Sequence, residues 1–388
     1  MRVLINTVPY YGKGEGVRTY TAELLRALHA SDADMEWHVA LHRPDFEALG
    51  LADDRRFRRV RMPAPVRASR IPGLRFATRN TIDQVTVPAR SRQYSAIHYL
   101  DSYGAVLPLG RVPMVLTVHD VIPLAGGAYH SRWVRRYLAG LMRASIGRAA
   151  AIMADSAVTA QHLMDILRVP ERRISVVPIG VDQVRFRPAS GDELARVRAT
   201  YALSEPYVIA VGTVEPRKNL VRLVRAFAQA HRTHYLPQQL VIVGKPGWAY
   251  DEVAAAVAAT DLGPAIRLLG YLPREDVAPL ISGADLLAYV SLEEGFGLPV
   301  AEGMACGAAV LASAASSVAE VAGDAAILVE PTDEDAIAAA LARLCLDAEL
   351  RERLSAAGLV RGRGYTWERV ARAAIASYRS VAAAPSVR

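Results

Sequence analysis

The chain has 388 residues, of which 52% are hydrophobic and 22% charged; this is ordinary globular composition, and the length predicts about two domains. Its two cysteines, Cys306 and Cys345, are too few for a disulfide framework and have no neighbours at metal-ligand spacing. No run of roughly 18 apolar residues and no signal peptide is present, so we expect a cytoplasmic protein that does not span a membrane.

The net charge of +7 is unevenly spread along the chain. Eleven arginines lie between residues 55 and 92, opposed only by Asp83, and five more lie on a predicted amphipathic helix at residues 132–148. Basic residues beside an apolar face suit an anionic membrane surface, so peripheral contact with the inner face of the plasma membrane is one interpretation. The alternative is an arginine-rich surface without a partner. Nucleic acid is not expected, because no recognised binding motif accompanies the charge.

Strand and helix patterns alternate along the whole chain, which predicts parallel sheets covered by helices on both faces. A turn-rich break at residues 177–188 separates two such series. We therefore predict an α/β protein with two doubly wound, Rossmann-like domains, 1–185 and 186–365, and a C-terminal segment, 366–388, whose helix packs back on the first domain. The predicted strands are residues 3–6, 37–41, 96–99, 114–119, 151–155, 174–177, 207–212, 239–243, 266–268, 286–290, 309–313 and 326–329.

The first strand leads into a glycine-rich loop that contains Gly12, Gly14 and Gly16, ahead of a helix predicted at 19–28. Such a loop is a candidate nest for a phosphate or an acceptor. It is not a dinucleotide fingerprint, because Val17 stands where the third glycine is required, and it is not a P-loop. A dehydrogenase and a P-loop ATPase are thus disfavoured.

Polar residues follow two further strands. The strand at 114–118 ends at His119, which is a candidate to contact a reacting group if a ligand site faces it, although a local hydrogen-bonding role is commoner. The strand at 207–212 leads through Thr213 to Arg217 and Lys218, just before an amphipathic helix. Cations at a helix start oppose its dipole unless an anion offsets them, and a diphosphate would do so.

The most informative segment places two carboxylates, Glu294 and Glu302, around a Gly295-Phe296-Gly297 turn that opens onto a helix at Leu298. The turn follows the predicted strand 286–290, at the carboxyl end where open α/β sheets bind ligands. Backbone amides and the helix dipole can hold anionic or hydroxyl-rich groups there, and glycines permit close approach. The alternative is a strand-to-helix turn with two solvated glutamates and no ligand. Binding of a phosphorylated sugar fits the pattern better.

These motifs together resemble the retaining glycosyltransferases of family four, which have the GT-B fold. The resemblance rests on His119-Asp120, on the segment from Gly212 to Asn219 and on Glu294-Gly-Phe-Gly-Leu-Pro-Val-Ala-Glu302, and it covers nearly the whole chain. It implies two domains facing across a cleft that holds a nucleotide-sugar donor.

By resemblance, Glu294 and the amides from Gly295 to Leu298 bind the sugar, Glu302 holds the ribose, and Arg217 and Lys218 neutralise the diphosphate. The resemblance also implies that His119 approaches the sugar, that the loop with Gly14 and Gly16 closes over phosphate and acceptor, and that Leu272 lines the base pocket. Many relatives carry an arginine where this chain has Thr213, so we expect Arg217 to substitute for it. No cofactor or metal is expected, since cations can stabilise the leaving diphosphate.

The sequence indicates the donor and the acceptor less closely than it indicates the family. Similarity to bacterial mannosyl- and rhamnosyltransferases of polysaccharide assembly favours GDP-mannose, with a UDP-hexose or UDP-N-acetylglucosamine second. The acceptor is a glycan, a lipid-linked sugar or a small molecule. Two other classes stay open: a nucleotide-sugar epimerase of the same fold, and a noncatalytic nucleotide-sugar-binding protein.

Overall fold

The structure is a computed structural model that describes residues 1–7, 15–31, 34–40, 49, 56–60, 87, 91–102, 112–125 and 132–384. The chain divides into two compact units. One comprises Met1–Gly180 with Trp367–Arg388, and the other comprises Val181–Thr366.

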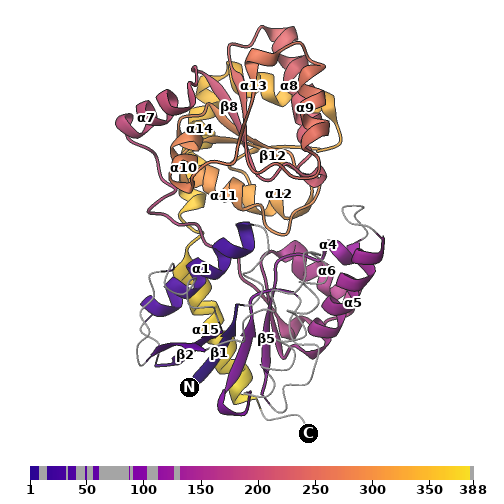
Figure 1. Ribbon diagram of the computed structural model, residues 1–388, viewed down its shortest axis with the longest axis vertical. Coiled ribbons are helices and arrows are strands. Elements are labelled where there is room, and N and C mark those ends of the chain that lie inside the picture. Colours follow the sequence, from indigo (N-terminus) through magenta and orange to yellow (C-terminus); the bar gives the residue numbers. More distant parts are fainter. Residues whose placement is uncertain are drawn as a thin grey trace, which may run out of the picture. The chain divides into compact units, whose positions relative to one another are not determined.

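The N-terminal unit is built on a parallel sheet in which the described residues form seven strands in the order β3-β2-β1-β4-β5-β6-β7. Helices α1 and α15 lie on one side of this sheet, and α4, α5 and α6 lie on the other (Figure 1). The strands are β1 (Arg2–Asn6), β2 (Glu36–Ala40), β3 (Phe57–Val60), β4 (Ala96–Tyr99), β5 (Met114–Val118), β6 (Ala151–Ala154) and β7 (Ile174–Val176). The helices are α1 (Glu15–Ala30), α4 (Ile122–Ala125), α5 (Arg132–Arg148), α6 (Ala157–Leu167) and α15 (Trp367–Ala383).

The C-terminal unit has a second parallel sheet, in the order β10-β9-β8-β11-β12-β13. Helices α8, α9 and α13 cover one face, and α10, α11 and α14 lie against the other (Figure 1). Its strands are β8 (Tyr207–Val211), β9 (Gln239–Val243), β10 (Ile266–Gly270), β11 (Leu286–Tyr289), β12 (Ala309–Ser313) and β13 (Ile327–Val329). Its helices are α7 (Gly191–Tyr201), α8 (Leu220–His234), α9 (Tyr250–Ala258), α10 (Arg274–Ser282), α11 (Leu298–Ala305), α12 (Ser316–Ala322), α13 (Glu334–Leu346) and α14 (Ala348–Gly362).

Both sheets have the doubly wound topology that the alternating pattern predicts. The first strand of each unit lies in the interior of its sheet, and successive strands are added first on one side of it and then on the other. The predicted fold class is therefore confirmed, and all twelve predicted strands are present to within two residues of their predicted ends. The short strand β3 was not predicted, because Phe57–Val60 has two arginines at its centre and no apolar alternation.

Apolar spacing explains how α8 is held on its sheet. Leu220, Leu223, Val224 and Phe227 recur at helical intervals, and all four are buried in the core of the C-terminal unit. Fully burying side chains of this size contributes about 1.5–3 kcal/mol each. This packing fixes the start of α8 and, with it, the short 3-10 turn η4 (Pro216–Lys218) that precedes it.

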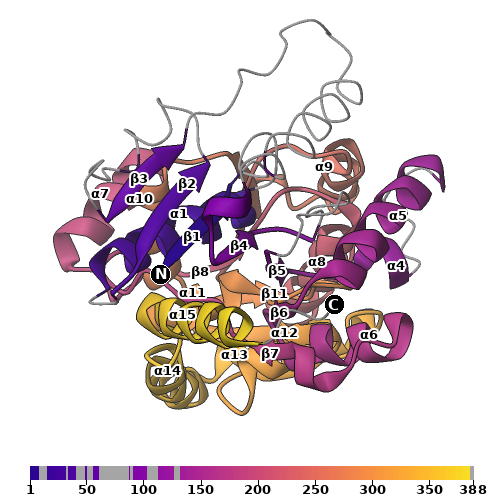
Figure 2. The ribbon, with the colours of Figure 1, turned by 90° about the horizontal axis from the view of Figure 1, so that it is seen from below.

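The C-terminal helix α15 belongs to the N-terminal unit, although the whole second unit lies between it and the rest of the N-terminal unit in sequence. It packs against α1, β4 and β5 and runs alongside their sheet (Figure 2). The Tyr378 hydroxyl lies 2.6 Å from His98 Nδ1, and the ring of Trp367 meets that of Tyr20 edge-on at 5.6 Å between centroids. The helix therefore completes the hydrophobic layer of this unit.

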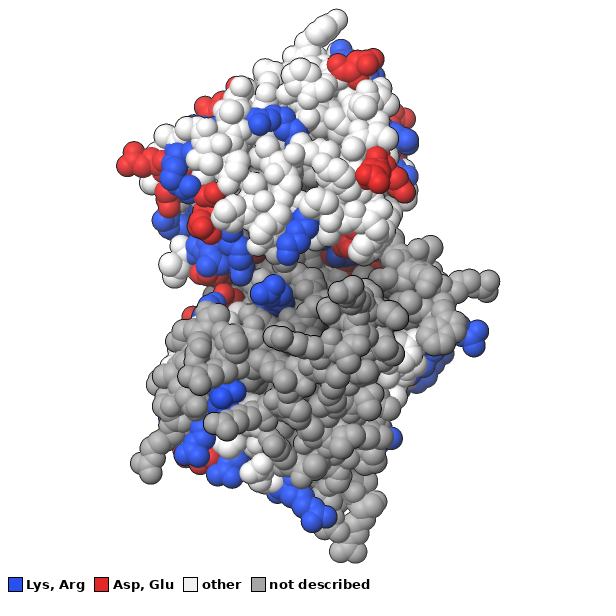
Figure 3. All heavy atoms as spheres, viewed as in Figure 1, with Lys and Arg blue, Asp and Glu red and all other residues white. Residues whose placement is uncertain are grey.

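Charged side chains of both signs are interspersed over the face of the C-terminal unit drawn in Figure 3. None of the helices that the structure describes is long and apolar enough to cross a bilayer.

Candidate functional site

The candidate site lies where β8 and β11 are neighbours in the C-terminal sheet. This is the switch point of the doubly wound topology, because β9 continues from β8 on the other side. Ligands of open α/β sheets bind outside the carboxyl ends of the strands at such a point. The segments that leave the two strands are joined there, since the Leu292 amide donates to the Arg217 carbonyl at 2.8 Å and Asn219 Nδ2 donates to the Val290 carbonyl at 3.0 Å.

Glu294 is the centre of this site. Its Oε1 accepts hydrogen bonds from Lys218 Nζ at 2.6 Å and from the Tyr289 hydroxyl at 2.8 Å, and its Oε2 accepts one from Arg217. The side chain is only 9% exposed. Burial pushes the pKa of Glu294 upward, but the charges of Lys218 and Arg217 outweigh it and lower that pKa to about 2. Glu294 is therefore an ionised carboxylate held by three donors.

The two cations are already neutralised inside the protein. Arg217 has a second partner, since its NH2 lies 2.5 Å from Glu215 Oε1. Burial lowers the pKa of Lys218, while the Glu294 carboxylate acts in the opposite direction. Two cations thus meet two carboxylates, Glu215 and Glu294. The sequence predicts that an anion offsets these cations, and in the structure two carboxylates of the protein itself do so. A diphosphate at this place stays a prediction.

The glycine turn is fixed by its surroundings. Gly297 has a φ of +96°, and a Cβ there would lie 3.2 Å from Val318 Cγ2, so a larger residue is disfavoured for both reasons. Phe296 is buried, with its ring edge-on to that of Tyr365 at 5.6 Å between centroids. Ser317 Oγ donates to the Glu294 carbonyl at 2.7 Å. Phe296 therefore anchors the turn through its side chain, and only its backbone is available to a ligand.

Glu302 is as buried as Glu294 but differs from it in its partners. It lies in the second turn of α11 and is 8% exposed, yet its carboxylate has no hydrogen bond or ion pair to any residue that the structure describes. Burial raises the pKa of Glu302 to about 8, with Arg274 and Arg185 acting in the opposite direction. A buried carboxyl group without a partner is costly unless a ligand satisfies it.

The loops after β8, β9 and β10 are packed together beside the switch point. A Cβ on Gly244 would lie 1.8 Å from the Gly212 carbonyl oxygen, so the β9 loop can approach the segment before Thr213 only because residue 244 is glycine. Leu272 is 6% exposed, so its side chain belongs to the core. Its neighbour Tyr271 is 51% exposed, and Lys245 Nζ lies 4.7 Å from the centroid of its ring.

His119 lies in the N-terminal unit, at the carboxyl end of β5. Its Nδ1 is 2.6 Å from Asp155 Oδ2 and its Nε2 is 3.1 Å from the Leu100 carbonyl oxygen. Both partners are acceptors, so both ring nitrogens donate and the ring is an imidazolium. Burial disfavours that charge, yet the Asp155 carboxylate raises the pKa of His119 to about 9. Both nitrogens are therefore engaged within this unit.

The glycine-rich loop is described only in part. Gly14 lies outside the described residues. Gly16 is the second residue of α1, so it belongs to a helix that begins four residues before the predicted start at residue 19. The amides of a first helical turn have no partner within the helix, and this holds for the Gly16 amide.

Sequence reasoning overlooked three residues that the structure places beside the predicted ones. Tyr289 and Glu215 contact the Lys218, Arg217 and Glu294 group, and Asp155 contacts His119. Each lies at or just beyond the carboxyl end of a predicted strand, and this position is the signal that the sequence offered. Without the strand order, nothing indicated which strand ends are neighbours.

Within the described residues, no three His, Cys, Asp or Glu side chains gather closely enough to hold a metal ion. Cys306 and Cys345 are both buried and free.

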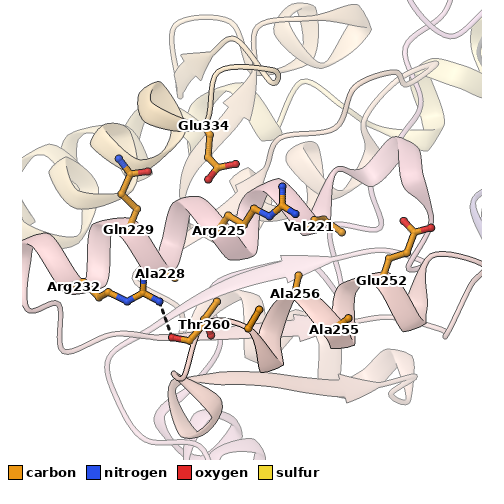
Figure 4. A pocket seen from close by; sticks show the side chains of 11 residues that line it. Val221, Arg225, Ala228, Gln229, Arg232, Glu252, Ala255, Ala256, Thr260 and Glu334 are labelled. Atoms are coloured by element: carbon orange, nitrogen blue, oxygen red, sulfur yellow. Dashed lines mark hydrogen bonds between the residues drawn. The ribbon is translucent and has the colours of Figure 1, made fainter.

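A groove of about 690 Å³ runs between α8 and α9, away from the residues of the candidate site (Figure 4). Its floor is made of alanines, and charged groups of both signs border it, including Arg225 and Arg232 from α8 and Glu252 from α9. Arg232 NH2 donates to the Thr260 carbonyl at 2.7 Å. None of the predicted site residues lines this groove, so it is not part of the candidate site.

Two models of known protein families match this chain. The model of Glycosyltransferase Family 4 matches residues 14–185, and that of Glycosyl transferases group 1 matches residues 194–360. The O-antigen chain mannosyltransferase B of Escherichia coli is 31% identical over 266 residues, which are 68% of this chain and 70% of that protein. The D-inositol 3-phosphate glycosyltransferase of Salinispora tropica is 34% identical over 241 residues, 58% of this chain and 49% of that enzyme. The serotype-specific mannosyltransferase WbdA of Escherichia coli is 27% identical over 286 residues. These are 72% of this chain but only 35% of that protein.

Solved structures share the fold over nearly the full length. The sucrose-phosphate synthase of Thermosynechococcus elongatus has a TM-score of 0.77 at 20% identity, with 99% of this chain and 100% of that one covered. Anabaena HepE in complex with UDP and glucose has a TM-score of 0.75 at 16% identity, with 98% and 100% covered. With two family models matched and this fold, the chain belongs to the family four glycosyltransferases of GT-B type.

Proposed function

We propose that this glycosyltransferase moves a hexose from a nucleoside-diphosphate sugar to a glycan, lipid-linked or small-molecule acceptor, with retention of the anomeric configuration. The observation that carries the proposal is the contact of Lys218 and Arg217 with Glu294 at the switch point of the C-terminal sheet. It brings together a cationic pair suited to a diphosphate and a carboxylate suited to sugar hydroxyls.

Donor binding then requires an exchange of partners. Arg217 and Lys218 have flexible side chains on the turn η4, and in this proposal they turn from Glu294 to the diphosphate oxygens. Charge-assisted bonds to a diphosphate replace those to the carboxylate, so no cation is left unpaired. Arg217 keeps Glu215 as its second partner, which fits its expected place as substitute for the charge absent at Thr213.

The two glutamates receive different parts of the donor. Glu294, released from its cations, accepts hydrogen bonds from the sugar hydroxyls beside the amides of Gly295 to Leu298. Glu302 accepts hydrogen bonds from the ribose hydroxyls, which would satisfy a buried carboxyl group that has no partner among the described residues. We place the base near Leu272, after β10.

The proposed reaction is a substitution at the anomeric carbon. The acceptor oxygen forms the new bond on the face from which the diphosphate oxygen departs, and the leaving phosphate takes the acceptor's proton. Arg217 and Lys218 stabilise the negative charge that develops on the leaving group. Glu294 orients and stabilises the sugar in this scheme and forms no covalent bond. His119, Gly14 and Gly16 belong to the other unit, and their contribution to donor binding stays a prediction.

GDP-mannose is the first choice of donor. The similarity to an O-antigen mannosyltransferase supports mannose, and the UDP and glucose bound by HepE, a protein of the same fold, support a UDP-sugar as second choice. We propose that the reaction uses no metal, since two side-chain cations already stand where the diphosphate is expected. A chelator is then expected to leave the rate unchanged.

The test is to incubate the protein with a panel of nucleotide sugars and to follow nucleoside diphosphate release with and without candidate acceptors. Glu294→Ala should abolish transfer, and Arg217→Ala with Lys218→Ala should abolish donor binding. Glu252→Ala, which changes an exposed glutamate on α9, is the matched control. The anomeric configuration of the product, read by NMR, decides between retention and inversion.

Three outcomes would contradict the proposal. Conversion of the donor sugar without an acceptor would indicate an epimerase, and donor binding without turnover would indicate a noncatalytic binding protein. Equal nucleoside diphosphate release by Glu294→Ala and the wild type would remove Glu294 from the site.

We further propose that α5 brings the N-terminal unit to an anionic membrane surface. This helix has five arginines and no acidic residue. Its side chains at Arg136, Arg143 and Arg148 are exposed, as is Tyr137, while Met142 and Ile146 on its other face are buried. A basic exposed face of this kind is attracted to anionic lipid at about 1 kcal/mol per arginine near the surface.

Vesicle sedimentation tests this contact. The wild type should bind phosphatidylglycerol vesicles at low salt and phosphatidylcholine vesicles weakly or not at all. The variant Arg136→Glu with Arg143→Glu should lose the binding, whereas Arg172→Glu with Arg372→Glu, an equal charge change at two exposed sites, should retain most of it. Equal loss in both variants would show that net charge alone is responsible.

A further inference from the structure

Tyr289 occupies a position in the site that no sequence motif indicated. It is the last residue of β11 and is 4% exposed. Its hydroxyl oxygen lies 2.5 Å from Lys218 Nζ and 2.8 Å from Glu294 Oε1. A lysine ammonium can only donate, so the Tyr289 hydroxyl accepts a hydrogen bond from Lys218 and donates one to Glu294. Tyr289 therefore bridges the cation and the carboxylate.

The three donors to Glu294 differ in their freedom to leave it. Lys218 and Arg217 extend from the short turn η4, and both carry long side chains. Tyr289 is held by its backbone, which pairs with Ala312 of β12, and its ring is buried beneath Lys218 Nζ, 4.8 Å from the centroid. If the two cations turn to a diphosphate, Tyr289 is the donor of this group that stays with Glu294.

We propose that Tyr289 is a positioning residue that keeps Glu294 oriented toward the donor sugar while Lys218 and Arg217 exchange that carboxylate for the diphosphate. The proposal rests on the proposed function, because the exchange occurs only if a diphosphate binds there. It assigns the hydroxyl a role beyond packing, since the ring alone would fill the same volume.

Removal of the Tyr289 hydroxyl should change the pH dependence of kcat. Burial favours the protonated form of Glu294, and its cationic neighbours oppose burial in the ligand-free protein. Once Lys218 and Arg217 contact the diphosphate, Tyr289 is the one of the three donors that remains on Glu294. Its hydrogen bond favours the ionised form of Glu294. Its removal should therefore allow Glu294 to take up a proton at higher pH in the donor complex, and kcat reports the ionisations of that complex.

The test compares Tyr289→Phe with Tyr207→Phe. Tyr207 is a matched control, because it is fully buried on β8 of the same sheet and its hydroxyl donates to the Leu280 carbonyl at 2.7 Å. Tyr289→Phe should lower kcat about 10- to 100-fold, the loss expected for a hydrogen bond to a charged group, and move the acidic limb of the kcat profile upward by about one pH unit. Tyr207→Phe should keep the limb in place and kcat within about threefold of the wild type.

Carbon-13 NMR of labelled glutamate separates this inference from the proposed function. With Glu294→Gln for assignment, the Glu294 carboxyl is titrated in each protein with and without inorganic pyrophosphate, which needs no turnover. A higher pKa of Glu294 in Tyr289→Phe than in Tyr207→Phe, with a larger difference under pyrophosphate, supports the positioning role. The same pKa in both variants, or the same kcat and acidic limb, would overturn it. A wild type that turns over no nucleotide sugar would contradict the proposed function instead.

Discussion

Lys218 Nζ lies 2.6 Å from Glu294 Oε1, although 75 residues of chain separate the two side chains. One follows β8 and the other follows β11, and these strands are neighbours because the sheet reverses its order at that point. The ion pair is buried, with side-chain exposures of 10% for Lys218 and 9% for Glu294. In the ligand-free protein the cation and the carboxylate thus satisfy each other, and the proposed donor would have to compete with both.

Removal of one partner of this pair should cost more stability than removal of both. Lys218→Met leaves the two carboxylates, Glu215 and Glu294, to share one cation, Arg217. We expect the free energy of unfolding to fall by roughly 2–4 kcal/mol, since an uncompensated buried charge is costly. Lys218→Met combined with Glu294→Gln should recover part of that loss. Urea unfolding of the four proteins in the double-mutant cycle measures the coupling. Lys245→Met, which changes an exposed lysine, serves as control, and strictly additive losses would contradict the expectation.

Glu302 should make the ligand-free protein less stable as the pH rises. Its pKa is raised to about 8 by burial, so the folded state retains a proton that the unfolded state releases near its ordinary value of 4.5. The free energy of unfolding should therefore fall between about pH 4.5 and pH 8 and level off above pH 8, by on the order of 2–5 kcal/mol. Glu302→Gln should remove this slope.

Glu302→Gln should accordingly match the wild type near pH 4.5 and exceed it in stability at pH 8, while its donor affinity falls. Urea unfolding at the two pH values checks the first point, and calorimetric titration with nucleotide sugar checks the second. Glu252→Gln on the exposed face of α9 should keep the wild-type slope. A variant that is less stable than the wild type at pH 8 would refute the assignment of this slope to Glu302.

His119 should titrate as a partner of Asp155. The pKa of His119 is raised to about 9 in the folded state, so the pair contributes stability that is complete below about pH 6.5 and is lost as the pH rises through 9. Asp155→Asn removes the carboxylate, after which burial should lower the pKa of His119 below 6.5. Imidazole NMR signals, assigned with His119→Gln, measure both values. Asp165→Asn, at an exposed aspartate on α6, should leave them unchanged.

Tyr378 should hold α15 on the N-terminal sheet. Its hydroxyl lies 2.6 Å from His98 Nδ1, and His98 Nε2 lies 2.8 Å from Thr117 Oγ1, so the ring is satisfied at both nitrogens. Burial, with a contribution from His119, lowers the pKa of His98 to about 3, which keeps that ring neutral. Tyr378→Phe leaves one buried nitrogen without its partner, which costs about 1–3 kcal/mol.

Hydrogen exchange localises this effect. Amides of β4, β5 and α15 should exchange faster in Tyr378→Phe, and those of β8 to β13 should not change. Tyr235→Phe, at a tyrosine that is 88% exposed, should affect neither set. Faster exchange spread over both units would argue against a local role for this hydrogen bond.

Much of the architecture could be predicted because it depends on local patterns. Buried parallel strands such as β5 and β12 are continuous apolar runs, and α8 repeats its apolar residues at helical spacing, so the side chains themselves specify the elements. The positions of Glu294 and Arg217 at strand ends followed from the same patterns. The strand β3 could not be found, because two of its four residues are arginines and it shows no apolar alternation.

The sequence by itself thus determined the two α/β units, the strand ends that carry polar residues and the family to which the chain belongs. Only the tertiary structure decided which of these groups meet. The approach of Tyr289, Lys218 and Glu294 depends on β8 and β11 being neighbours. The contrast between an ionised Glu294 and a Glu302 without a partner among the described residues depends on what surrounds each carboxylate. Hydrogen bonds and pKa values are set by distances of a few ångströms, and such distances arise from the order of strands in a sheet rather than from separation along the chain.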